Sequence, residues 1–477
     1  MRSGSRDRTW AAALALIVGA LAAPAAADEN VLKPQVAAGA VDAFKAALDE
    51  RWSYRHANRA DFDGEIAALR KRVAGGISTD ELGLELHKIL ALGIDGHSLV
   101  LGYHLPSGGC LPFLVEAEGE RFVAFDPSRK AFLADGLPYL TKIDGVDIAT
   151  WCAAATMLVP KGSPQYLRQR SLRLLREIDY WRGVMPLPKK ETVEVEVTGT
   201  DGIAHKTLTL PVARSPLAAD VWPPGGSRLL EGGIGYLRLP TMRQAASVAE
   251  IREWMPKFRD TAGLVVDVRD NNGGERDALL LLYSYLAAPD DPPRVFTAAA
   301  YRLNRAHKEN HLAEHHHMYR AGAKEWTARE RAAVAQFAKA FKPQWTLPKG
   351  QFSDWHYLAL TRLSDPALYY YDRPVIVLLN AKCFSATDIF LAGLKGMKNV
   401  LLLGSPSGGG SAFGQDVPLG QTPLEVRIGS MVSFQADGRL FDTNGIRPDV
   451  ELAPVPEYYI GGPDNVLEEA VRRLKSR

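Results

Sequence analysis

A serine placed between a short apolar strand and a helix is the first residue of this sequence with the setting of a nucleophile. Residues 374–379 are apolar and mostly β-branched or leucine, and Ser385 directly precedes the amphipathic run 386–394. A serine at such a turn can expose its hydroxyl at the end of a sheet, while free N–H groups of the helix stabilise a developing oxyanion. The letters Ser-Ala-Thr-Asp also fit a capping box, in which Ser385 only satisfies the first helical turn.

Two glycines follow a second predicted strand, residues 263–268. Gly273 and Gly274 allow the backbone to approach a ligand closely and to direct N–H groups at an anionic oxygen. An ordinary turn after a buried strand is the alternative, with Asp267 and Arg269 as a structural ion pair that holds it.

A base for the serine is also present in the sequence. His97 lies in the segment Asp95-Gly96-His97-Ser98, at the end of a region with helical periodicity. Neutral histidine is the side chain best suited to take a proton at pH 7, although an isolated histidine is more often structural. Cys383, two positions before Ser385, is a second possible nucleophile, but a buried apolar role fits this cysteine better.

The elements that position these residues fall into two regions before residue 214. Apolar residues recur at helical spacing from Val36 to about Gly93, which predicts an all-helical opening. Short β-like runs then follow at residues 111–115, 121–125, 140–148, 192–197 and 207–212. The last two flank Asp201-Gly202, a strong hairpin signal.

A new unit begins after the stretch 214–228, which is rich in proline and glycine and is typical of a linker. Short apolar runs alternate with helical patterns in this unit, and this alternation predicts a mostly parallel α/β core. Residues 301–345 are polar, charged and helical in character with no strand, and we interpret them as an insertion that could cover a cleft.

Composition bounds the class of protein. The chain has 477 residues, 46% of them hydrophobic and 23% charged, which suits two or three globular domains. The net charge of +2 is spread without a basic stripe, which argues against nucleic acid as a partner. With three cysteines, Cys110, Cys152 and Cys383, at most one disulfide can form.

The N-terminus has the three regions of a secretory signal. Arg2, Arg6 and Arg8 precede an apolar run that starts at Trp10, and three alanines precede Asp28. We therefore expect a signal peptide over residues 1–27 and a mature protein that is exported, periplasmic or secreted, without stable membrane insertion. An uncleaved anchor is disfavoured because the run is shorter than the ~20 residues of a span.

In this order, these segments resemble the C-terminal processing peptidase and tricorn-core family of serine peptidases. The matching segments are Asp95–Ser98, Leu140–Ile148, Asp267–Gly274, Phe384–Asp388 and Asn444–Val450. The resemblance implies an α/β core of the crotonase and Clp-protease type, residues 229–477 with a helical insertion 301–345. It further implies a helical N-terminal unit over 28–105 that carries the base, a PDZ-like β-rich domain over 106–213, and a linker over 214–228.

The family divides by the base that serves its serine. In the processing peptidases a lysine on a later loop does so, and Gly410 stands where that lysine would fall. The tricorn-like branch uses a histidine ahead of the PDZ domain, a position that His97 matches. A carboxylate near the segment Gly445–Asp449 completes the array in that branch; Asp442 is the candidate, while Asp449 is assigned a structural role.

The resemblance implies a serine-type endopeptidase that hydrolyses polypeptides through an acyl-enzyme on Ser385, with His97 as general base and Asp442 orienting the imidazole. Gly273, Gly274 and Ala386 would supply the oxyanion hole. No cofactor and no metal are implied. The alternatives are a catalytically silent peptide- or ligand-binding protein on the same fold, and an esterase with the same serine chemistry.

Two further features keep alternatives open. The PDZ-like segment implies capture of a peptide end by strand addition, but the expected helix is hard to place within residues 151–182. In the insertion, His307, His311 and His315 recur at helical spacing before His316 and His317, which is compatible with zinc. A solvated helix is the favoured interpretation, because no acidic and cysteine ligands complete a site.

Overall fold

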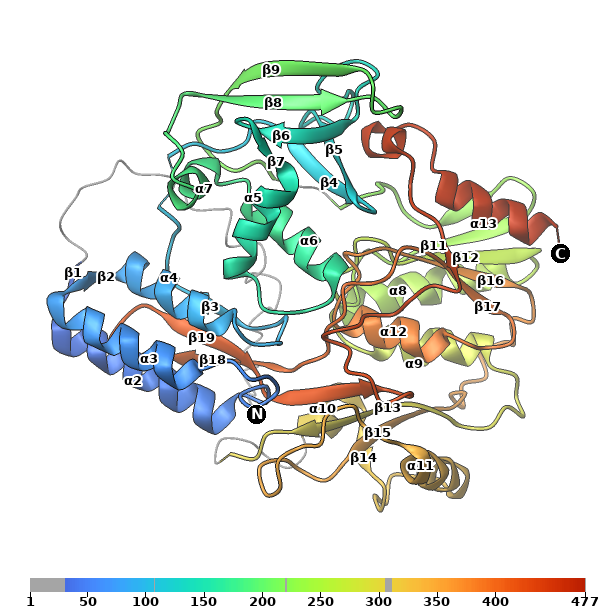
Figure 1. The fold of residues 1–477 in the computed structure, drawn as a ribbon. Coiled ribbons are helices and arrows are strands. Elements are labelled where there is room, and N and C mark those ends of the chain that lie inside the picture. Colours follow the sequence, from blue (N-terminus) through green and yellow to red (C-terminus); the bar gives the residue numbers. More distant parts are fainter. Residues whose placement is uncertain (1–30, 107, 219–220, 305–310, 477) are drawn as a thin grey trace, which may run out of the picture.

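The computed structural model describes residues 31–106, 108–218, 221–304 and 311–476 (Figure 1). The predicted signal peptide 1–27, His307 and two residues of the predicted linker lie outside the described residues. Within the described ranges, none of the helices combines the length and the apolar character that a membrane crossing needs.

The central sheet has six strands in the order β10-β11-β12-β16-β17-β21, and all are parallel except β10, which pairs antiparallel with β11. Strands β11, β12 and β16 are buried along their whole length, as expected for parallel strands covered on both faces. The predicted α/β class is confirmed. The strands span Arg228–Leu230, Ile234–Arg238, Gly263–Asp267, Val375–Leu379, Val400–Gly404 and Val450–Glu451.

Helices cover both faces of this sheet. Leu264 and Val266 of β12 pack with α8, α9 and α12, whereas Val265 points to the opposite face and packs with α13. The alternation of side chains along a strand thus divides one apolar run between two cores. The helices α8, α9, α12 and α13 span Gln244–Trp254, Asp277–Leu286, Ala386–Leu394 and Asn465–Lys475.

A second sheet, in the order β14-β15-β13-β20, lies at the lower edge of the view in Figure 1 with α11 beside it. The predicted strand-free insertion is wrong in one respect, because Tyr319–Arg320 forms β14 and pairs with β15. The capping box of Thr327 and Glu330 begins α11. The elements span Arg294–Tyr301 (β13), His311–His316 (α10), Tyr319–Arg320 (β14), Ala328–Ala340 (α11), His356–Leu360 (β15) and Met431–Gln435 (β20).

The N-terminal helices pack on strands from the far end of the chain. Strand β3 extends the hairpin β18-β19, and Val426 and Ile428 of β19 share one core with Phe44 of α2 and Leu86 of α4. The prediction of an all-helical opening is therefore incomplete, because this unit also contains β1, β2 and β3. The elements are Val31–Leu32 (β1), Pro34–Arg51 (α2), Phe62–Arg72 (α3), Ile77–Ser78 (β2), Thr79–Leu90 (α4), Leu99–Leu101 (β3), Gly414–Pro418 (β18) and Glu425–Gly429 (β19).

The β-rich unit between them has strands in the order β4-β5-β6-β8-β9, with β7 paired to β6. The hairpin predicted at Asp201-Gly202 is confirmed by the pairing of β8 with β9. Three helices, α5, α6 and α7, lie in or overlap residues 151–182, where the expected helix is hard to place from the sequence. The elements are Leu114–Glu118 (β4), Arg121–Phe125 (β5), Tyr139–Ile143 (β6), Val146–Asp147 (β7), Ile148–Ala155 (α5), Pro164–Leu174 (α6), Ile178–Val184 (α7), Thr192–Thr198 (β8) and His205–Pro211 (β9).

Helix α6 joins the β-rich unit to the core. Its N-cap Ser163 donates to the Gly408 carbonyl at 2.6 Å, and Gln165 Nε2 donates to the Ser407 carbonyl at 2.7 Å. Figure 1 shows α6 below the strands of its own unit and next to the loops of the core. These bonds fix α6 against the loop that follows β17.

Candidate active site

Ser385 lies at a strained turn between β16 and α12. Its backbone has φ 61° and ψ −124°, a left-handed conformation that is rare outside glycine, and its side chain makes no capping hydrogen bond. The N–H of Phe384 donates to the Asn271 carbonyl at 3.1 Å, and the N–H of Gly408 donates to the Cys383 carbonyl at 2.8 Å. The capping interpretation is wrong, since the turn leaves the hydroxyl free of the helix.

His97 contacts this hydroxyl from the N-terminal unit. Its Nε2 lies 2.9 Å from Ser385 Oγ, across 288 positions of sequence. Asp95, which is fully buried, holds the loop: it accepts from the His97 N–H at 3.0 Å, from Trp52 Nε1 at 2.9 Å and from the Gly429 N–H at 2.6 Å. The histidine is therefore positioned by contacts with both ends of the chain.

The electrostatic setting keeps the imidazole neutral. The pKa of His97 is lowered to about 4, first by burial and then by the guanidinium groups of Arg170 and Arg427, against the opposing charge of Asp95. At neutral pH, Nε2 or Nδ1 can therefore carry the single proton, and the tautomer with a free Nε2 can accept from Ser385.

Asp442 is buried close to the same histidine. Its Oδ2 accepts from the Tyr54 hydroxyl at 2.6 Å and from the Ser411 N–H at 3.3 Å. Burial and the charge of Asp95 raise the pKa of Asp442 to about 7. One ligand atom from each of Asp95, His97 and Asp442 lies within 4.8 Å of the others.

Neither carboxylate completes a hydrogen bond with the imidazole. His97 Nδ1 and Asp442 Oδ1 are both buried without a partner among the described residues, and Asp95 Oδ1 is 4.0 Å from Nδ1. Asp442 is thus brought to the imidazole without a direct bond to it.

The three predicted oxyanion residues lie beside Ser385 but differ in what they offer. The N–H of Gly273 already donates to Asn271 Oδ1 at 2.9 Å, so its predicted role as a donor is not fulfilled in this arrangement. The N–H groups of Gly274 and Ala386 have no partner in the described part of the chain. At φ 108°, a Cβ on Gly273 would lie 2.7 Å from Ser385 Cβ and 3.0 Å from Ala386 N, so this glycine supplies space.

Asn271, which the sequence analysis did not single out as a site residue, connects the two turns. Its Oδ1 accepts from Gly273 and from Thr387 Oγ1 at 2.8 Å, while its Nδ2 donates to the Leu239 carbonyl at 2.8 Å. The run Asp-Asn-Asn-Gly-Gly was the available signal, because asparagine side chains commonly bond the backbone within turns.

Two structural interpretations made from the sequence, the ion pair of Asp267 with Arg269 and the buried role of Cys383, are confirmed. Arg269 pairs with Asp267 at 2.6 Å, and although burial alone would raise the pKa of Asp267, Arg269 and Arg238 hold it at about 2. Cys383 is fully buried, its thiol donates to the Val268 carbonyl at 3.1 Å, and burial raises its pKa. Cys110, Cys152 and Cys383 are all free.

The loop after β17 has no room for a lysine at the position assigned to it in the processing peptidases. A Cβ on Gly410 would overlap the ring of Phe384, the residue before Ser385. The structure thus gives a steric reason for glycine at this position.

The histidines of the insertion form an aromatic contact. The rings of His311, His315 and His316 lie 5.3, 5.4 and 5.5 Å from that of Phe413. His311 is buried, so the expectation of a fully solvated helix is wrong. Within the described ranges, these histidines belong to no group of three potential metal ligands.

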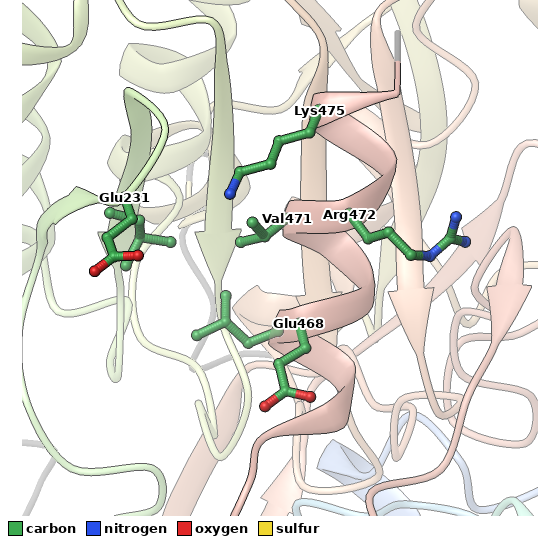
Figure 2. Close-up of a pocket in the computed structure, with 7 residues that line it drawn as sticks. Glu231, Glu468, Val471, Arg472 and Lys475 are labelled. Atoms are coloured by element: carbon green, nitrogen blue, oxygen red, sulfur yellow. The ribbon is translucent and has the colours of Figure 1, made fainter.

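A surface hollow lies elsewhere, between β10 and α13 (Figure 2). It is lined by Leu230, Glu231, Leu467, Glu468, Val471, Arg472 and Lys475. None of the predicted catalytic residues lines it; Ser385, His97 and Asp442 lie instead at the junction of the N-terminal unit and the core.

This chain is similar to known proteins in the sequence of its core and in the fold of nearly the whole chain. The sequence model described as peptidase family S41 matches residues 233–452. The structure of mature CPAF complexed with lactacystin has a TM-score of 0.62 and 15% identity, over 93% of this chain and 100% of that chain. A further structure of mature CPAF has a TM-score of 0.62 and 16% identity, over 92% of this chain and 97% of that chain. The likeness in fold therefore includes the N-terminal and β-rich units.

Proposed function

We propose that this chain, whose residues 233–452 match the sequence model of peptidase family S41, is an exported serine endopeptidase of the Ser-His branch. A peptidase of this family would act on a polypeptide substrate. The observation that carries the assignment is the 2.9 Å approach of His97 Nε2 to a Ser385 hydroxyl that caps no helix. This is the pairing of nucleophile and base that acyl transfer requires.

Catalysis then proceeds in two halves. Ser385 Oγ attacks the carbonyl carbon of the scissile peptide bond and passes its proton to His97 Nε2. The oxyanion accepts hydrogen bonds from the N–H groups of Gly274 and Ala386, which have no partner in the described part of the chain. His97 returns the proton to the leaving amine, and water attacks the acyl-enzyme by the same route.

Asp442 supports the charge that forms on His97 during attack. Once ionised, its carboxylate favours the imidazolium from within 4.8 Å. The Tyr54 hydroxyl donates to Asp442 Oδ2 at 2.6 Å and so fixes the orientation of the carboxylate. Asp95 accepts from the Trp52 indole and from backbone N–H groups, and so positions the loop of His97. Asp442 is therefore the third member of the array with Ser385 and His97.

Labelling with a fluorophosphonate probe tests the assignment. The mature protein should label, whereas Ser385→Ala and His97→Ala should not, and Ser128→Ala, which alters an exposed turn serine, should label as the wild type does. A folded wild-type protein that stays unlabelled would instead favour the silent binding protein. Turnover of an ester but not of the matched peptide would favour the esterase.

Export is tested separately. We expect the secreted or periplasmic protein to begin at Asp28, after removal of residues 1–27, and N-terminal sequencing of that protein reads this directly.

A further inference from the structure

Arg170 on α6 lies beside the catalytic pair. Its guanidinium carbon is 5.2 Å from the ring centroid of Phe384 and 5.3 Å from that of Tyr166. Phe384 directly precedes the nucleophile, and its ring centroid is 4.7 Å from that of His97. The two aromatic faces therefore hold a cation next to the reacting groups.

The charge of Arg170 has no carboxylate partner within the described part of the chain. Arg427, the other guanidinium that acts on His97, is neutralised by Asp416 through two bonds of 2.6 and 2.7 Å. Arg170 is partly buried. Its charge lowers the pKa of the Tyr166 hydroxyl, but burial has the larger effect, and the pKa is raised to about 12. Of the two cations near His97, only Arg170 thus remains available to an incoming anion.

An unneutralised cation here opposes catalysis by the free enzyme. Protonation of His97 during attack places a second positive charge near Arg170, and like charges disfavour each other. A substrate carboxylate bound to Arg170 would remove this repulsion and would form charge-assisted hydrogen bonds with a guanidinium already oriented by the rings.

Positive charge continues along the same helix. Arg173 follows Arg170 in α6, and Arg176 lies just beyond the end of the helix; burial together with the charges of Arg170 and Arg176 lowers the pKa of Arg173 to about 10. The positive charge at the C-terminal end of α6 therefore favours an acidic segment over a neutral or basic one.

We propose that Arg170 is a specificity-determining residue that binds a carboxylate of the substrate polypeptide close to the scissile bond. The inference rests on the proposed function and names the substrate class: polypeptides with an acidic side chain, or the C-terminal carboxylate, near the site of cleavage.

Matched peptides test it with the mature protein. Each pair differs only by Glu against Gln at one position, and a second series carries a free or an amidated C-terminus. We expect wild-type kcat/KM to favour one carboxylate by about tenfold or more, and Arg170→Gln to reduce this ratio to near one. Arg170→Glu should favour the matched Lys peptide instead.

Arg168→Gln is the control, since Arg168 lies on the same helix but pairs with Glu120 at the surface. It should keep the wild-type ratio. Sensitivity to Glu against Gln assigns a side-chain carboxylate, and sensitivity to amidation assigns the chain end; both support the site.

A wild-type enzyme without any such preference, or a preference that survives in Arg170→Gln, overturns the inference. Fluorophosphonate labelling separates this result from a failure of the proposed function. An enzyme that labels on Ser385 without a carboxylate preference loses only the role of Arg170, whereas absence of labelling removes the peptidase assignment itself.

Discussion

Two buried polar atoms near the nucleophile, His97 Nδ1 and Asp442 Oδ1, have no hydrogen-bond partner among the described residues. Burial holds the pKa of His97 at about 4 and that of Asp442 at about 7. Between these values both groups are neutral, and above about pH 7 Asp442 carries a charge. His97 can therefore accept a proton at any pH above about 4, but Asp442 carries the charge that would stabilise the imidazolium only above about pH 7.

This difference predicts the pH profile. We expect kcat/KM for a peptide substrate to be lost below about pH 4, where His97 is protonated, and to rise again through about pH 7 as Asp442 ionises. Asp442→Asn should lose the second rise and be slower by roughly 10²-fold at pH 8. A pH–rate series on both proteins measures this. If the variant kept the rise near pH 7, another group would have to be its source.

At the scale of elements, the two strand-to-helix turns work as one unit because Asn271 bonds both. Gly273 is the residue at which the first turn comes close to Ser385. In Gly273→Ala, the new Cβ would lie 2.7 Å from Ser385 Cβ, in a backbone conformation with φ 108°. The new Cβ would also crowd the N–H of Ala386, a predicted oxyanion donor. We expect labelling by a fluorophosphonate to be at least about 10²-fold slower, because loss of one oxyanion donor slows catalysis by that order.

Gly322→Ala is the matched control for this substitution, because a Cβ there would meet nothing within 4 Å. It should label at the wild-type rate and unfold at an unchanged temperature. If Gly273→Ala labelled equally fast, Gly273 would not set the space around the nucleophile.

The sequence predicted those parts of the site that depend on local pattern. The turns at Gly273 and Ser385, the hairpin at Asp201-Gly202 and the parallel core all follow from strand periodicity and turn residues over short stretches. The resemblance then selected His97 and Asp442. The structure brings these residues together, and their catalytic roles remain predictions.

Other features depend on contacts that no local pattern specifies. Tyr54 bonds Asp442 across 388 positions, and β3 pairs with β19 although over 300 positions separate them. An amphipathic helix and a half-buried strand each look the same whichever partner covers them. The engagement of the Gly273 N–H with Asn271 likewise depends on a side-chain rotamer, which the motif alone leaves undetermined.

At the scale of the whole molecule, a partly buried lysine ties the β-rich unit to the turn that carries Ser385. Lys382 lies 2.5 Å from Glu116 of β4 and 3.2 Å from Asp270 of the core. Glu116→Gln leaves this ammonium with one carboxylate, so we expect the free energy of unfolding to fall by about 1–3 kcal/mol. Denaturant unfolding measures the change.

Glu120→Gln breaks the surface pair with Arg168 in the same unit and should change the free energy of unfolding by less than about 1 kcal/mol. Equal effects of the two substitutions would show that the Lys382 pair adds no more than a surface contact does.

The position of Asp442 also links stability to pH for the whole fold. Its pKa rises from an ordinary value of 3.8 to about 7 in the folded protein, so between these pH values the native state holds a proton that the unfolded chain has released. This contribution to stability is complete below about pH 4 and is lost as the pH rises through about 7. Asp442→Asn keeps an oxygen acceptor for Tyr54 without the ionisation.

We therefore expect Asp442→Asn to exceed the wild type in stability by about 2–4 kcal/mol at pH 8, with a smaller difference at pH 5. Thermal unfolding at both values measures this, and Asp437→Asn, at an exposed pair with Arg439, should show no such dependence. A variant that is less stable at pH 8 would mean that the ionised carboxylate is stabilised where it lies. Greater stability with slower turnover would identify Asp442 as a group retained for catalysis against the stability of the fold.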